Sequence, residues 1–223
     1  MKVCTDACLF GAWTVRHLKD AKNILDIGTG TGLLSLMIVQ KSPGLVDAIE
    51  YDHESYLQAE QNITASSWSD RINIIEGDVR HYPFKRNYDF IITNPPFFES
   101  DLQSPEQNKN LAKHSIMLSL QELIKVVDQI LKPQGFLAIL LPFQRTVYFK
   151  KIASEFGFFL KEEMTVRQTP DHDPFRSLAI YSRDLKEPTV CTEMSIKKDR
   201  KYTDKFTLLL KDYYEDTAFS NKS

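Results

Sequence analysis

The sequence predicts an α/β protein built on a mostly parallel β-sheet with helices on both faces. Strand-like and helix-like apolar segments alternate through the first two thirds of the chain, which is the pattern of parallel strands joined by crossover helices. The segment from Phe136 to Leu141 is apolar throughout, as expected of a strand at the buried centre of such a sheet. A glycine-rich turn, Gly28 to Gly32, separates the first strand from the first helix.

Seven segments have the apolar content of strands: Asn23 to Ile27, Leu45 to Ile49, Arg71 to Glu76, Asp89 to Thr93, Phe136 to Leu141, Phe159 to Gln168 and Ser177 to Arg183. Apolar residues at helical spacing predict helices at Leu33 to Gln40, Ser55 to Asn62, Ser119 to Leu131 and Thr146 to Phe156. The turn Lys132-Pro133-Gln134-Gly135 is expected to end the third helix. Because the last two strands are close in sequence, we expect them to pair antiparallel.

Length and composition indicate one domain with a full core. The chain has 223 residues, of which 42% are hydrophobic, enough for one sizeable α/β domain and too little for two independent ones. We expect a single domain over residues 1–219. The last residues, 220–223, are expected to be a frayed tail.

Charge, cysteine content and hydropathy limit the compartment and the partners. The formal net charge is −2, so a nucleic acid would have to be held by a local basic patch. Three cysteines, with no paired spacing, indicate neither a disulfide framework nor a zinc site. The histidines His81, His114 and His172 also lack metal-ligand spacing, and no metal is expected. The longest apolar run is too short to span a bilayer, so a cytoplasmic protein without a membrane partner is expected.

The glycine turn has the spacing Asp26-x-Gly28-x-Gly30-x-Gly32. This spacing differs from the G-x-G-x-x-G fingerprint of dinucleotide sites. Glycines allow positive φ and let a ligand approach the backbone closely. A carboxylate at Asp26 would repel a phosphate but suits a ligand that carries an amino group, such as S-adenosylmethionine.

Two further acidic residues follow the next two predicted strands. Glu50 closes the second strand, where a carboxylate can accept both ribose hydroxyls, although it could also be an ordinary exposed strand end. Asp78 follows the third strand and could accept from an adenine amino group. A turn capped by the Asp78 side chain is nearly as plausible.

The tetrapeptide Asn94-Pro95-Pro96-Phe97 directly follows the strand Asp89 to Thr93. Proline fixes φ and keeps the preceding residue extended, so the Asn94 amide oxygen and a proline carbonyl can face one point. Two such acceptors would hold both N–H groups of an exocyclic amine and align its nitrogen for attack on a methyl carbon, while Phe97 stacks on the ring. The alternative is that Pro-Pro only ends a strand and Phe97 belongs to the core.

Taken together, these motifs resemble the class I S-adenosylmethionine-dependent methyltransferases that methylate amines, which have a Rossmann-like, seven-stranded, mostly parallel sheet with one antiparallel strand. The chain is more closely similar to the bacterial tRNA1(Val) (adenine(37)-N6)-methyltransferase group. That similarity rests on the start Met1 to Ala7, on Gly11-Ala12-Trp13, on Asn94 to Phe98 and on Tyr202-Thr203 to Phe206. Cys4 stands where this group tends to have glycine.

The resemblance implies a role for each matching residue. Lys2, Thr5 and Asp6 would flank the cofactor S-adenosylmethionine. Its methionine part would be held by Asp26, Gly28, Gly30 and Gly32, its ribose by Glu50 and its adenine by Asp78, with Asn94 also beside the cofactor. The catalytic residues would be Asn94, Pro95, Pro96 and Phe97, which bind the target base.

The resemblance implies N6 methylation of an adenine in RNA, most plausibly in a tRNA anticodon loop, with tRNA as substrate and a monomer favoured. Two basic clusters are candidates for RNA contact, although either could be an ordinary solvated face: Lys197, Lys198, Arg200 and Lys201 beside Tyr202, and Arg145, Lys150 and Lys151. The loop Glu99 to Asn110 is long enough to cover a substrate.

Other functions share the Asn-Pro-Pro core. An N5-glutamine protein methyltransferase is the main alternative, but it usually has Tyr in place of Phe97 and a separate helical domain. DNA adenine methylation would require a target-recognition domain. A noncatalytic scaffold would be expected to have lost the tetrapeptide or the glycine turn, and both are intact here.

Overall fold

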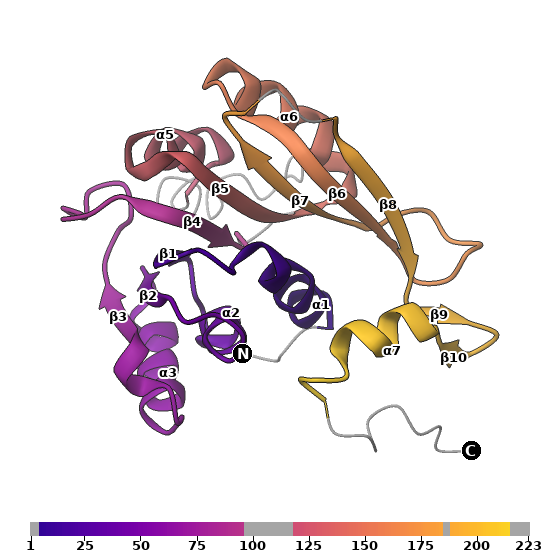
Figure 1. The fold of residues 1–223 in the computed structure, drawn as a ribbon, viewed down its shortest axis with the longest axis horizontal. Helices are drawn as coiled ribbons and strands as arrows, with labels where there is room; N and C mark the ends of the chain where they lie inside the picture. The colour runs from indigo at the N-terminus through magenta and orange to yellow at the C-terminus, as the bar shows by residue number, and fades with distance from the viewer. Residues whose placement is uncertain (1–4, 96–117, 185–187, 215–223) are drawn as a thin grey trace, which may run out of the picture.

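The computed structural model describes residues 5–95, 118–184 and 188–214. An eight-stranded sheet with the order β3-β2-β1-β4-β5-β7-β6-β8 forms the centre of the molecule (Figure 1). Its strands are β1 (Asn23–Ile27), β2 (Leu45–Glu50), β3 (Ile72–Glu76), β4 (Tyr88–Thr93), β5 (Leu131–Pro142), β6 (Phe159–Arg167), β7 (Arg176–Ser182) and β8 (Val190–Ser195).

The sheet is parallel except for one strand. Strand β7 pairs antiparallel with both β5 and β6, while β8 pairs parallel with β6. The predicted antiparallel pairing of the last two expected strands is therefore confirmed.

The expected count of seven strands was wrong by one, because β8 was missed. In β8 only Met194 is buried, so this edge strand lacks the apolar run by which the other seven were recognised.

Helices cover both faces of the sheet, as predicted (Figure 1). One core cluster contains buried residues of α1 (Thr5–Thr14), α2 (Leu33–Val39), α3 (His53–Thr64) and α7 (Asp204–Leu210). A second cluster on the opposite face contains those of α5 (Leu120–Ile130) and α6 (Thr146–Glu155). Alternate side chains of the central strands enter opposite clusters, with Ile24 and Phe90 in the first and Leu25 and Ile91 in the second.

Strand β5 is longer than expected at its start. The turn Lys132-Pro133-Gln134-Gly135 was expected to separate helix from strand, but the strand already begins at Leu131, which pairs with Tyr88 of β4. The register then shifts between Tyr88 and Phe90, which accommodates this turn at the edge of the pairing. The remaining predicted elements match the structure to within about two residues at each end.

The last described part of the chain contains a small hairpin and a helix. Strands β9 (Lys197–Lys198) and β10 (Lys201–Tyr202) pair antiparallel, and α7 follows directly. Helix α7 packs against α1, with Phe206 and Leu210 buried in the same cluster as Phe10 and Trp13. Within the described ranges, no helix combines the length and apolar character needed to cross a bilayer.

Candidate active site

The four strands that carry the predicted site residues are neighbours. In the parallel register Ile27 lies beside Thr93 of β4 and beside Ile49 of β2, and Glu50 lies beside Glu76 of β3. The glycine turn, Glu50, Asp78 and Asn94 therefore follow adjacent strands at one edge of the sheet, the carboxyl edge. Ligands of open α/β sheets bind at this edge.

The glycine turn has the backbone that its sequence predicts. Gly28, Gly30 and Gly32 have φ values of 68°, 60° and 81°, a region that other residues rarely adopt. A Cβ on Gly28 would meet no atom of residues 5–95, 118–184 or 188–214 within 4 Å, so these parts of the chain leave open space beside the turn. The turn is tied to the neighbouring strand because the Gly28 N–H donates to the Ile49 carbonyl at 2.9 Å.

Asp26 is completely buried beneath this turn. Its Oδ2 accepts hydrogen bonds from the Thr29 and Ser35 hydroxyls, both at 2.7 Å, and so holds the turn to α2. Its Oδ1 has no hydrogen-bond donor among the described residues. Burial raises the pKa of Asp26 to about 6, and these two hydroxyls only partly oppose the effect.

Glu50 lies at the end of β2, half-buried, and its carboxylate is already bound to backbone donors. Oε2 accepts from the Gly30 N–H at 2.8 Å, and Oε1 accepts from the Tyr51 and Asp52 N–H groups. Because Oε2 accepts only one of these hydrogen bonds, it keeps a lone pair for a ribose hydroxyl. Its orientation is set before any ligand arrives.

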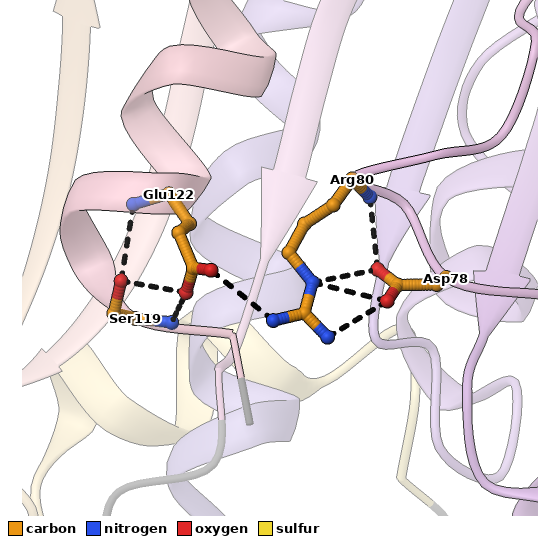
Figure 2. A network of polar contacts seen from close by, with 4 residues as sticks. All are labelled: Asp78, Arg80, Ser119 and Glu122. Atoms are coloured by element: carbon orange, nitrogen blue, oxygen red, sulfur yellow. Dashed lines mark hydrogen bonds and ion pairs between the residues drawn. The ribbon is translucent and has the colours of Figure 1, made fainter. Parts of the chain in front are cut away.

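Asp78 forms a turn and an ion pair at the same time. Its Oδ1 accepts from the Arg80 backbone N–H at 2.9 Å, as in a turn capped by an aspartate. The Arg80 guanidinium also donates to both carboxylate oxygens, with the shortest contact, Nη2 to Oδ2, at 2.7 Å (Figure 2). These hydrogen bonds lower the pKa of Asp78. The capped turn is present, and it does not exclude a contact with adenine.

Arg80 links Asp78 to the start of α5, as Figure 2 shows. Its Nη1 donates to Glu122 Oε1 at 3.1 Å, and Glu122 completes a capping box with Ser119. The sequence analysis missed both Arg80 and Glu122. The spacing Asp78-x-Arg80 could have indicated the first contact, but the pairing with a residue 42 positions later has no local signal.

Asn94 and Pro95 lie at the carboxyl end of β4, with Pro95 buried and Asn94 half-buried. The preceding residue, Thr93, is anchored because its hydroxyl donates to the Ile27 carbonyl at 2.9 Å. This bond crosses from β4 to the strand that ends in the glycine turn. The amide that was predicted to bind the target amine therefore directly follows a fixed residue beside the turn.

Of the remaining predicted site residues, Thr5 and Asp6 open α1. The Asp6 carboxylate accepts from Arg176 Nε at 2.8 Å, and Arg176 pairs with Pro142 at the carboxyl end of β5, so α1 begins at this same edge. Lys2, Pro96 and Phe97, the predicted covering loop and the predicted frayed tail lie outside the described residues. Among those described, no group of three or more His, Cys, Asp or Glu side chains could hold a metal ion.

Comparisons with known proteins agree with this arrangement. A family model described as the methyltransferase small domain matches residues 12–161. The tRNA1(Val) (adenine(37)-N6)-methyltransferase of Dyadobacter fermentans is 41% identical over 219 residues, which cover 96% of this chain and 90% of that relative. The protein of the same name from Bacteroides fragilis is 38% identical over 220 residues, covering 96% and 91%.

Solved structures match at the level of the fold. A predicted O-methyltransferase from Agrobacterium tumefaciens has a TM-score of 0.70 at 17% identity, with 92% of this chain and 94% of that one covered. A TehB-like S-adenosylmethionine-dependent methyltransferase from Corynebacterium glutamicum has a TM-score of 0.53 at 16% identity, covering 82% and 89%. The chain thus has the Rossmann-like class I methyltransferase fold and belongs to the methyltransferase small domain family, within the group of the tRNA1(Val) (adenine(37)-N6)-methyltransferases.

Proposed function

We propose that this protein transfers a methyl group from S-adenosylmethionine to the N6 amine of an adenine in tRNA, and that it does so in the cytoplasm, as a monomer and without a metal. The names of its relatives support this substrate. The observation that carries the proposal is the position of Asn94 and Pro95 at the end of β4, next to the glycine turn that ends β1. The binding sites for the methyl donor and for the target amine would then lie side by side, at the ends of the paired strands β1 and β4.

The residues at this edge fit S-adenosylmethionine. The open space beside Gly28 admits a ligand to the backbone. Buried Asp26 has one carboxylate oxygen that no described residue donates to, which suits a ligand bearing an ammonium group. The Glu50 carboxylate, oriented by Gly30, would take the ribose hydroxyls, and Asp78 the adenine amine. When bound, the cofactor supplies an electrophilic methyl group on a sulfonium.

The chain's own contribution is to bind and orient the target amine. The Asn94 amide oxygen and the Pro95 carbonyl would each accept one N–H of the adenine amine, which directs the nitrogen lone pair away from them. Both acceptors also stabilise the positive charge that develops on nitrogen during transfer. No general base is required for this step, because the proton can leave once the nitrogen has become cationic. An adenine in a single-stranded loop reaches such a pocket at low cost.

An N5-glutamine protein methyltransferase would use the same two acceptors. The names of the similar proteins favour the adenine substrate instead. The decisive assay measures transfer of labelled methyl to tRNA that lacks its native modifications, with nucleosides identified by mass spectrometry. New N6-methyladenosine supports the proposal, whereas label in a protein and none in RNA contradicts it.

Asn94→Ala tests the role of the amide. We expect kcat for methyl transfer to fall about 10²–10³-fold, because one stabilising hydrogen bond to the transition state is lost, while the dissociation constant of S-adenosylmethionine stays within about threefold of wild type. Asn87→Ala, at an exposed position before the other end of β4, is the matched control and should leave both quantities unchanged. Equal losses of transfer and of cofactor binding in Asn94→Ala would contradict the assigned role.

A further inference from the structure

Positive charge is concentrated in one small element, the hairpin formed by residues 197–202, which we call the basic hairpin. It carries Lys197, Lys198, Arg200 and Lys201 against a single acidic residue, in a chain whose formal net charge is −2. All six residues are exposed. In the part of the chain that the structure describes, Lys198, Arg200 and Lys201 form no ion pair with a carboxylate. The charge of the hairpin is therefore available to an external partner.

The turn of the basic hairpin is strained in an unusual way. Lys198 pairs with Lys201, so Asp199 and Arg200 form a two-residue connection, and their φ values are 51° and 64°. Within the described residues they are the only non-glycine residues with positive φ. Two-residue hairpins with this geometry normally carry Asn-Gly or Asp-Gly. An arginine here is unfavourable for the backbone, and strain of this kind is common at functional sites.

The hairpin is firmly attached to the body of the molecule. The Tyr202 ring stacks on Phe206, with centroids 5.0 Å apart and planes 12° apart, and the Lys197 ammonium lies 5.0 Å from the Tyr202 ring centre. Phe206 is buried in the core, and Thr203 caps α7 by accepting from the Phe206 N–H. The basic side chains are thus presented by a supported element, which reduces the ordering cost of binding.

The basic hairpin lies at the carboxyl edge of the sheet, where the candidate active site also lies. Ser195, at the end of β8, pairs with Arg167 at the end of β6, and the hairpin begins two residues later. In Figure 1 the hairpin projects beyond the ends of β6 and β8. The strand order places β8 four strands from β4, which is on the order of 20 Å at the usual strand spacing. This distance is too long for contact with the target base but suits another part of the same RNA.

From these observations we propose that the basic hairpin binds backbone phosphates of the RNA substrate away from the methylated adenine. Arg200, Lys198 and Lys201 supply the charge, and the exposed ring of Tyr202 can contact a sugar or base. The proposal rests on the proposed function, because it takes RNA as the substrate. It adds a defined contact surface, and it predicts that large RNA substrates use this surface whereas short ones do not.

The test replaces Lys198, Arg200 and Lys201 together by Gln and measures methylation kinetics and RNA binding at several salt concentrations. The KM for unmodified full-length tRNA should rise about tenfold, and the slope of log K against log salt should become shallower by about 2, since each lost phosphate contact removes about 0.7–0.9. The kcat at saturating tRNA and the affinity for S-adenosylmethionine should not change. A short oligonucleotide centred on the target adenine should show no change in KM.

Two controls separate contact from folding. Lys19→Gln/Lys85→Gln/Lys125→Gln removes the same charge from three exposed positions outside the hairpin and should alter the KM for tRNA by less than about twofold. Arg200→Gly removes one charge but favours the positive φ, so thermal stability should be kept or raised while RNA affinity falls.

Suppose that the wild-type protein methylates tRNA and that the triple hairpin variant has the same tRNA affinity and salt slope. This result would overturn the proposal and indicate that the hairpin binds a different acidic partner. If wild-type protein neither binds nor methylates unmodified tRNA, the proposed function fails and this contact fails with it.

Discussion

Asp26, near the end of β1, and Asp78, just after β3, lie at the same edge of the sheet, yet the pKa values of their carboxyl groups are shifted in opposite directions. Asp26 is buried, one of its oxygens has no donor in the described part of the chain, and burial raises its pKa to about 6. Asp78 is bound by the Arg80 guanidinium, and its pKa is lowered. Residue type and strand position are thus not enough to assign a role. Within the described residues Asp26 forms no ion pair, whereas Asp78 is paired with the Arg80 guanidinium.

The largest effect is expected from Asp26→Asn. Since the pKa of an aspartate is ordinarily 3.8 and that of Asp26 in the folded protein is about 6, its contribution to folding is fully present below pH 3.8 and is lost as the pH rises through 6. Asn can still accept from Thr29 and Ser35 but carries no charge. The cofactor-free variant should therefore gain up to about 3 kcal/mol in the free energy of unfolding above that pH, measured by urea denaturation across the pH range.

The same variant tests whether Asp26 meets the cofactor's ammonium group. Binding of a cation beside Asp26 should lower its pKa and release a proton near pH 6, which titration calorimetry detects in buffers of different ionisation enthalpy. Asp26→Asn should bind S-adenosylmethionine more weakly and show no such release. Proton release that persists unchanged in the variant would show that Asp26 is only a support for the glycine turn.

A smaller effect is expected from Asp78→Asn, which separates the two interpretations of this residue. Asparagine keeps the turn, because its side-chain oxygen can accept from the Arg80 N–H, but it is a weaker acceptor for an adenine amine. The dissociation constant of S-adenosylmethionine should rise about tenfold, equivalent to about 1.4 kcal/mol, while loss of the ion pair with Arg80 should cost about 1 kcal/mol of stability or less. An unchanged dissociation constant would reduce Asp78 to a turn residue.

The smallest effect is expected from Arg80→Gln. The ion pair is partly exposed, with 18% of the Arg80 side chain and 21% of the Asp78 side chain accessible, so its loss should cost about 1 kcal/mol of stability or less. The pKa of Asp78 should rise toward its ordinary value, which NMR titration of the carboxyl carbon measures. Arg80→Lys is the control and should recover part of this pKa difference. A variant in which Asp78 titrates as in wild type would show that Arg80 does not set its charge.

Most of the sheet was predictable because its strands bury one or both faces and are therefore rich in apolar residues. The segments that became β1 to β7 all had this apolar signal. The glycine turn was predictable for a different reason, since glycine adopts positive φ more readily than any other residue. Strand β8 and helix α7 had weaker signals, since β8 buries only Met194 and α7 is seven residues long. Such short or exposed elements depend on tertiary contacts more than on local pattern.

The parts of the candidate site that consist of short local motifs could be predicted from the sequence. Asp26, Glu50, Asp78 and Asn94 each follow or close a strand, and the parallel register brings them to one edge. Contacts from distant elements were not predictable: Ser35 of α2 donates to Asp26, and Glu122 of α5 accepts from Arg80, the partner of Asp78. Nor does any glycine mark the turn at Asp199 and Arg200, so its positive φ was not expected.

The packing of α7 on α1 also has a consequence for the order in which the molecule is made. The face of α1 that carries Phe10 and Trp13 shares its core with Phe206 and Leu210, almost two hundred residues later. At about 5–20 residues per second, a ribosome needs roughly 10–40 s to make the chain between them. During that time the part of α1 that α7 covers in the folded protein lacks this cover, although α2 is already made, so we expect the nascent chain to be more prone to aggregation until α7 has emerged.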